Sequence, residues 1–135
     1  MRLKKQQIFF IKNQNRENQT MPIRIFEITS YKIKLGYRMS ATFGVTTLKA
    51  VGIISCMGPD NQRINIYFLH DDSQTPNPAV TNRGKWGNIF LQKEMMPVWM
   101  DLLRNEKPLF GYINTEVPKL TNVSTSHEPV GEEEL

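Results

Sequence analysis

The nine residues Tyr-Lys-Ile-Lys-Leu-Gly-Tyr-Arg-Met at positions 31–39 decide the fold. Their odd positions are apolar or aromatic, and their even positions are basic except for Gly36. This alternation is typical of a half-buried β-strand, because successive side chains of a strand point to opposite faces. We therefore expect Lys32, Lys34 and Arg38 to project from one face of that strand.

Strand patterns continue on both sides of this stretch. They lie at residues 22–30, 45–57, 63–70, 88–92 and 109–114. The first of these changes its apolar side near Phe26, which predicts either one bent strand or two short ones. The turn residues Gly58-Pro59-Asp60-Asn61 predict a hairpin between the second and third segments. A long polar connection follows at residues 71–86.

One helix pattern follows the strand at residues 88–92. Its apolar positions have the spacing of one helix face and are Met95, Val98, Trp99, Leu102 and Leu103. Pro97 is tolerated only in a first turn, and Pro108 stops a helix, so we expect the regular part at residues 96–106.

These elements predict an α+β fold that is mainly β. We expect a strongly curved or barrel-like antiparallel sheet of about five strands, with one amphipathic helix near the C-terminal end. A single helix covers little of such a sheet, so either the sheet closes or its uncovered side is buried in a homodimer.

Length and composition define the domain organisation. The chain has 135 residues, which allows one domain with short appendages. We expect a basic polar N-terminal extension at residues 1–21, a single globular domain at 22–117 and an acidic flexible tail at 118–135. Strand patterns begin only after Met21, which is a candidate for the natural start, so that the extension would not be native. No apolar run is long enough to span a membrane.

The net charge of +4 is distributed unevenly along the chain. Residues 1–20 carry five basic residues against one acidic residue, and the last fifteen residues carry four glutamates. A chain that begins at Met21 is neutral overall. Any attraction for nucleic acid must therefore come from asymmetric charge on the surface.

Basic residues next to aromatic ones suggest a binding surface for nucleic acid. Single-stranded nucleic acid is bound by cations that follow the phosphates and by aromatic rings on which bases stack. The candidate residues are Lys32, Lys34 and Arg38 in the strand and Arg83, Lys85 and Trp86 at the end of the long connection. The alternative is an ordinary solvated strand face, with Trp86 as a core residue.

The segment from Gly87 to Leu102 resembles a known family. Gly87-Asn88-Ile89-Phe90-Leu91, followed by a helix pattern with Trp99 and Leu102, is similar to the last strand and the helix of the transcriptional-coactivator and Whirly type of single-stranded-DNA-binding domain. In that family a meander of strands precedes this strand and helix. The resemblance implies a dimer packed through the helix. It also implies nucleic-acid contacts from Lys32, Lys34, Arg38 and Lys85.

An enzyme is the third interpretation. His70-Asp71-Asp72 stands at a strand end, where a histidine with two carboxylates could bind a divalent metal or transfer protons. A turn start explains the same residues. His127 with Glu128 is a weaker pair, in the tail. Cys56 is interpreted as a small buried residue of a strand, and no catalytic residue, metal site or cofactor is predicted.

We therefore expect a non-enzymatic binding module for single-stranded DNA or RNA that acts in the cytoplasm, with no membrane partner, as a homo-oligomer with a dimer favoured. A single cysteine allows no internal disulfide and fits a reducing compartment. The alternative is a protein-interaction or oligomeric scaffold domain, and a small metal-dependent enzyme ranks below both.

Overall fold

Two sheets and one α-helix form the structure, a computed structural model that describes residues 22–71 and 74–125. The strands are β1 (Ile23–Glu27), β2 (Ser30–Phe43), β3 (Thr46–Met57), β4 (Arg63–Leu69), β5 (Ala79–Thr81), β6 (Trp86–Gln92), β7 (Phe110–Asn114) and β8 (Asn122–Ser124). The helix is α2 (Met96–Asn105), and three short 3-10 turns are η1 (Pro59–Asn61), η2 (Lys93–Met95) and η3 (Pro118–Leu120).

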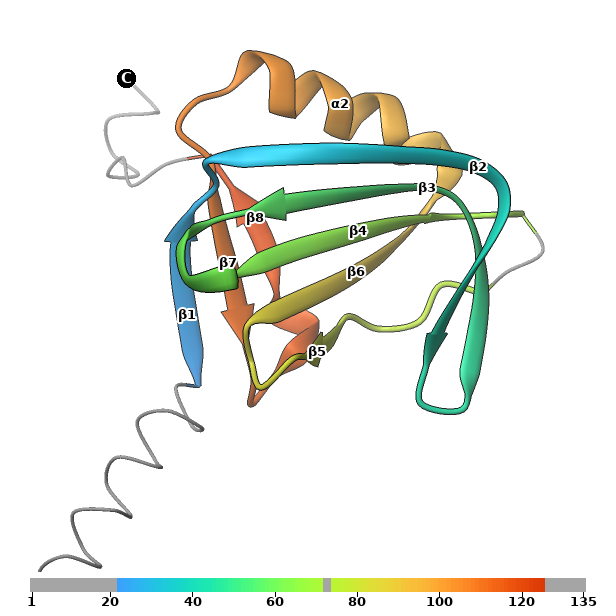
Figure 1. Cartoon of the computed structure of the whole chain (residues 1–135), viewed down its shortest axis with the longest axis horizontal. Helices are drawn as coiled ribbons and strands as arrows, with labels where there is room; N and C mark the ends of the chain where they lie inside the picture. The colour runs from blue at the N-terminus through green and yellow to red at the C-terminus, as the bar shows by residue number, and fades with distance from the viewer. Residues whose placement is uncertain (1–21, 72–73, 126–135) are drawn as a thin grey trace, which may run out of the picture.

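The larger sheet has five strands in the order β2-β3-β4-β6-β5, and the smaller sheet has the order β1-β7-β8. Strands β2, β3 and β4 are antiparallel neighbours, whereas β6 runs parallel to β4. Strand β2 lies at one edge of the larger sheet and β5 at the other (Figure 1). The connection between β4 and β6 returns the chain to the same end of the sheet, which makes this pair parallel.

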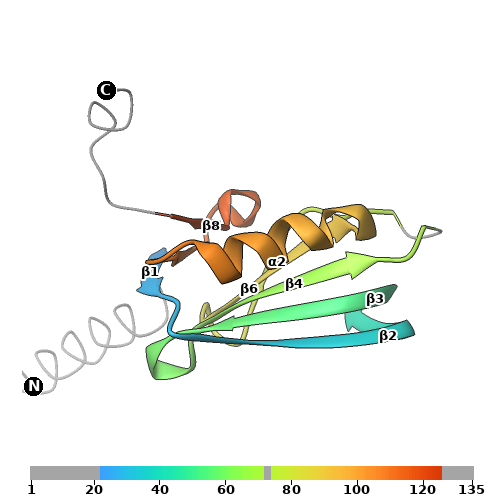
Figure 2. The same ribbon diagram turned by 90° about the horizontal axis from the view of Figure 1, so that it is seen from above.

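The larger sheet has one covered face and one open face. Helix α2 and the smaller sheet lie on the same side of it, as the view from above shows (Figure 2). We call the face that packs on them the covered face and the opposite one the open face. Because the second layer buries one apolar face, the sheet does not need to close on itself.

The hydrophobic core lies between the covered face and this second layer. Ile54, Ile64, Ile66 and Phe68 have no exposed surface. They form one cluster with residues of the second layer, which are Phe26, Leu103, Leu109 and Ile113. Each fully buried side chain of this size stabilises the fold by roughly 1.5–3 kcal/mol. Most of the stability of the domain therefore comes from the covered face.

Helix α2 begins and ends where its sequence requires. Pro97 lies in its first turn, where a missing N–H is harmless, and the helix stops at Asn105, before Pro108. The side that faces the core includes Met96, Trp99, Met100, Leu102 and Leu103. It is rotated from the expected face, since Met95 and Val98 are 40% and 58% exposed.

The end of the β2–β3 hairpin folds over the open face (Figure 1). Register shifts between Leu35 and Met39 and between Ala50 and Gly52 bend the two strands. Phe43 then packs edge-on against Tyr67 and Phe90, with ring centroids 5.2 and 5.0 Å apart. This cluster holds the hairpin end against the sheet.

The structure confirms a mainly β fold with one helix near the C-terminal end. The expected barrel-like closure is wrong, because both sheets are open and β1 pairs with β7 in a separate sheet. The strand pairs are predominantly antiparallel, and β4 with β6 is the parallel pair among the described strands. Near the change of apolar side at Phe26 the structure has two strands and not one bent strand, since β1 ends at Glu27 and β2 begins at Ser30.

Two short strands lie in segments that were expected to be irregular. Strand β5 falls in the long connection, and β8 falls in the segment expected to be a tail. Strand β8 pairs with β7, and Thr121 just before it is buried. Three residues are too few for a period-two pattern. Residues 1–21 and 126–135, including His127 and Glu128, lie outside the described residues. Within the described ranges, no helix is long and apolar enough to cross a membrane.

Candidate nucleic-acid interface

The strand register places Lys32 at the end of a polar row across the open face. Lys32 pairs with Ser55, Ser55 with Asn65, and Asn65 with Asn88. The Asn65 amide donates a hydrogen bond to Asn88 Oδ1 at 3.1 Å, and the Asn88 amide donates to Thr81 Oγ1 at 2.9 Å. Ser55, Asn65 and Asn88 are buried, so these hydrogen bonds fix the polar groups at the centre of the face.

Lys34 ends a second row, which is aromatic. It pairs with Ile53, which is followed across the sheet by Tyr67 and Phe90. The Tyr67 and Phe90 rings are stacked, with centroids 5.4 Å apart. Tyr67 is half-buried, and this burial raises the pKa of its hydroxyl above the ordinary value of 10.0. An exposed cation and an aromatic surface therefore share one face.

Arg63 and Trp86 end a third row on the same face. They are cross-strand partners, and the Arg63 guanidinium lies 4.7 Å from the centroid of the Trp86 ring. The indole N–H donates a hydrogen bond to the Asn61 carbonyl at 3.0 Å. Trp86 is half-buried, so it is both an anchor and a part of the surface. A base that approaches this pair meets a guanidinium plane as well as an indole ring.

The open face contains positive charge without carboxylates. Strands β2 to β6 carry five basic residues, of which the register places Lys32, Lys34 and Arg63 on the open face; the other two are Arg38 and Lys49. In these described strands no residue is Asp or Glu. Neither Lys32 nor Lys34 forms an ion pair with a described residue. The potential over the face is consequently not cancelled by acidic groups within the sheet.

A groove of about 660 Å³ lies on the open face beneath the hairpin end. Its floor is formed by Ile53, Tyr67 and Asn88, and the hairpin contributes Thr42 and Phe43. The groove has the size and the mixture of apolar and polar groups that small-molecule or base-binding pockets have. Trp86 also lines the groove, so one ligand there can reach both Tyr67 and Trp86, whereas Phe90 is buried.

Arg38 lies outside the regular pairing that places Lys32 and Lys34 on one face, so simple alternation does not extend to it. It lies between Leu35 and Met39, where the register with β3 shifts. After this irregularity Met39, and not Arg38, pairs with Ala50 of the cluster on the open face. Three residues of β2, 36–38, stand against the single residue Val51 of β3, so Arg38 belongs to the irregular segment of β2.

Arg83 and Lys85 lie at the edge opposite to β2, in the turn between β5 and β6. Arg83 has a positive φ of 57°, and the Lys85 N–H donates to the Asn82 carbonyl at 3.1 Å. The expected basic site is therefore divided between two edges. The distance from β2 to β6 is three strand spacings, or roughly 14 Å. Arg63 and Trp86 stand between the two groups.

The sequence interpretation missed Arg63, Tyr67 and Asn88. The alternation at residues 63–69 does separate Tyr67 and Asn65 from the core-facing residues Ile64, Ile66 and Phe68. The sequence does not show that β4 pairs with β6, because the two strands are parallel and no turn motif connects them.

Two residues of the alternative chemical site, His70 and Asp71, are described, and each has another partner. The Asp71 carboxylate forms an ion pair with Lys93, with Oδ2 and Nζ 3.0 Å apart, and the His70 ring contacts the Tyr37 ring edge-on. Asp72 lies outside the described residues. Among the residues that the structure describes, no group of three His, Cys, Asp or Glu could hold a metal ion.

Cys56 is a core residue, as expected. It has no exposed surface and belongs to the cluster of the covered face. Burial raises the pKa of its thiol from 9.0 to about 12, so the thiolate needed for nucleophilic chemistry does not form at neutral pH.

A comparison of the chain with protein-family models, curated proteins and solved structures finds no match. The similarity of residues 87–102 to the Whirly type of domain stays a prediction. The strand-then-helix order of β6 and α2 agrees with it. The parallel pairing of β4 with β6 departs from a simple meander.

Proposed function

We propose that the protein is a non-enzymatic module that binds single-stranded nucleic acid across the open face. The observation that carries this proposal is a five-stranded sheet without carboxylates whose open face combines Lys32, Lys34 and Arg63 with the half-buried rings of Tyr67 and Trp86. Cations neutralise phosphates and release counterions, and rings stack bases without requiring a particular sequence.

The path of the ligand follows from the order of the strands. A single strand that crosses the sheet from β2 to the β5–β6 turn passes Lys32 and Lys34 first, then Arg63 and Trp86, and finally Arg83 and Lys85. Cations at both edges hold the phosphates, and the aromatic rows between them receive bases. The groove beneath the hairpin end gives one base a partly enclosed position.

The proposal needs only one copy of the chain, because every residue named comes from the same sheet. The homodimer and the cytoplasmic location expected from the sequence stay predictions. The resemblance to the Whirly type of domain supports the same ligand class.

Fluorescence anisotropy with labelled oligothymidylate and oligouridylate tests the proposal. We expect binding whose affinity falls steeply with salt, with a slope of about −0.7 for each phosphate neutralised. The double variant Lys32→Glu, Lys34→Glu should weaken binding by roughly tenfold or more. The matched control is Lys119→Glu, an exposed lysine of η3 in the other layer, which should bind as the unmodified protein does. Absence of binding at low salt would contradict the proposal.

A second variant separates stacking from charge. Tyr67→Leu keeps an apolar side chain on the sheet but removes the ring, so it should lose about 1–3 kcal/mol of binding free energy while the salt slope stays unchanged. A change of slope without a change of affinity at low salt would show that Tyr67 does not stack on a base.

A further inference from the structure

Strand β2 presents an unpaired edge. It is the terminal strand of the larger sheet, and residues 30–35 pair regularly with β3 on one side only. Among the described residues no strand lies on its other side. An exposed strand edge is a template for another extended chain, because its backbone N–H and C=O groups have no partner in the sheet.

The α2 side of this edge is apolar and exposed. Tyr31, Ile33 and Leu35 are 40%, 36% and 66% exposed, although their cross-strand partners belong to the buried covered face. A period-two pattern predicted that these side chains would be buried. They are exposed because α2 does not cover the edge strand.

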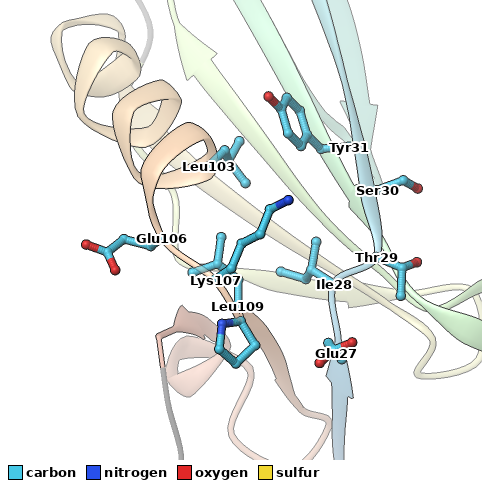
Figure 3. Close-up of a pocket in the computed structure, with 10 residues that line it drawn as sticks. Glu27, Ile28, Thr29, Ser30, Tyr31, Leu103, Glu106, Lys107 and Leu109 are labelled. Carbon is cyan, nitrogen blue, oxygen red and sulfur yellow. The ribbon is translucent and has the colours of Figure 1, made fainter.

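A groove of about 730 Å³ opens between the start of β2 and the end of α2. Ile28, Tyr31 and Leu103 line this groove, and Figure 3 shows them with the charged side chains of Glu106 and Lys107 around it. The groove lies beside Tyr31, at the start of the apolar row of β2, and can receive an apolar side chain of an added strand.

We propose that the β2 edge and this groove bind an extended protein segment in which acidic and apolar residues alternate. The apolar residues of the segment would extend the row of Tyr31, Ile33 and Leu35, and the one beside Tyr31 would enter the groove. Its acidic residues would lie on the other side of the sheet, next to Lys32 and Lys34. Opposite charges directly across two strands stabilise the pair, and main-chain hydrogen bonds supply affinity.

Charge also argues against a second copy of this chain as the occupant. In an antiparallel pair of β2 strands centred on Ile33, Lys32 of each copy lies opposite Lys34 of the other. Registers centred on Lys32 or Lys34 place a lysine opposite itself. Like charges directly across a strand pair are destabilising, and edge lysines commonly prevent such association.

The inference goes beyond the proposed function, and peptide binding tests it separately from nucleic-acid binding. The probe is a short synthetic peptide of alternating glutamate and valine, labelled for fluorescence anisotropy with the full chain. We expect saturable binding, at least roughly tenfold weaker binding of the lysine–valine peptide, and loss of binding when alternate backbone nitrogens of the peptide are methylated.

Variants of the protein localise the site. Ile33→Asp should weaken peptide binding by roughly tenfold or more. The matched control Val45→Asp changes a fully exposed valine at the tip of the hairpin and should leave peptide binding unchanged. Circular dichroism and thermal unfolding verify that both variants are folded.

Three results would overturn the inference. The first is no binding of the glutamate–valine peptide, and the second is equal binding of the lysine–valine or methylated peptide. The third is a dimer in sedimentation experiments that Ile33→Asp dissociates, because the edge would then belong to a second copy of the chain.

Discussion

The two faces of the five-stranded sheet are built from the same strands but differ in the side chains that they present. On the covered face, Ile54, Ile66 and Phe68 have no exposed surface. On the open face, the neighbouring positions are occupied by polar groups, aromatic rings and cations such as Asn65, Tyr67 and Lys34. Alternation along a strand thus separates the core side chains of the covered face from a face on which Lys34 is exposed and Tyr67 is half-buried.

The largest expected effect tests this division at adjacent residues. Phe68→Ala removes a fully buried ring from the covered face and should lower the free energy of unfolding by about 3–5 kcal/mol, measured by urea titration. Tyr67→Ala, one residue earlier and on the open face, should cost clearly less because the ring is only half-buried. Equal losses of stability would contradict the division, because the open face would then contribute as much to the stability of the fold as the covered face.

A smaller effect concerns the polar row. Asn88 is 1% exposed. Its side chain accepts a hydrogen bond from Asn65 and donates one to the Ala79 carbonyl at 3.1 Å. Asn88→Ala leaves the buried Asn65 amide without this acceptor and should cost about 1–3 kcal/mol in the same titration. The exposed Asn77, between β4 and β5, provides the control, because Asn77→Ala should change stability by no more than about 0.5 kcal/mol. A neutral Asn88→Ala would mean that the row is not needed to fix the centre of the open face.

The last effect concerns the thiol of Cys56 on the covered face, and it is confined to alkaline pH. The pKa of the Cys56 thiol is raised in the folded protein from 9.0 to about 12, so folding favours the protonated form. This contribution is complete below pH 9 and is lost as the pH rises from about 9 towards 12. Cys56→Ala should therefore flatten the alkaline decline of stability. A native protein whose thiol reacts at pH 8 as fast as an unfolded one would contradict the burial.

The sequence was sufficient to predict elements whose signal is local. The helix expected at residues 96–106 is observed at Met96–Asn105, because Pro97 and Pro108 mark both ends. The hairpin at residues 58–61 is also found, since turn residues are specific for local geometry.

Other features depend on contacts between distant residues. The separate sheet of β1, β7 and β8 and the parallel pair of β4 and β6 have no local signature. For the candidate site, alternation correctly placed Lys32 and Lys34 on one face. It did not predict the irregularity before Met39, which takes Arg38 out of the regular pairing with β3. Arg63 and Tyr67 were missed because their position beside β6 depends on that parallel pair.

Photochemical crosslinking tests most directly whether the open face is the ligand-binding face. An oligonucleotide that carries 4-thiothymidine is irradiated with the protein, and the crosslinked peptides are identified by mass spectrometry. We predict crosslinks at Tyr67 and Trp86, which are lost in the double variant Lys32→Glu, Lys34→Glu. Crosslinks confined to β1, β7 or α2, or no crosslinks at low salt, would contradict the assignment of nucleic-acid binding to the open face.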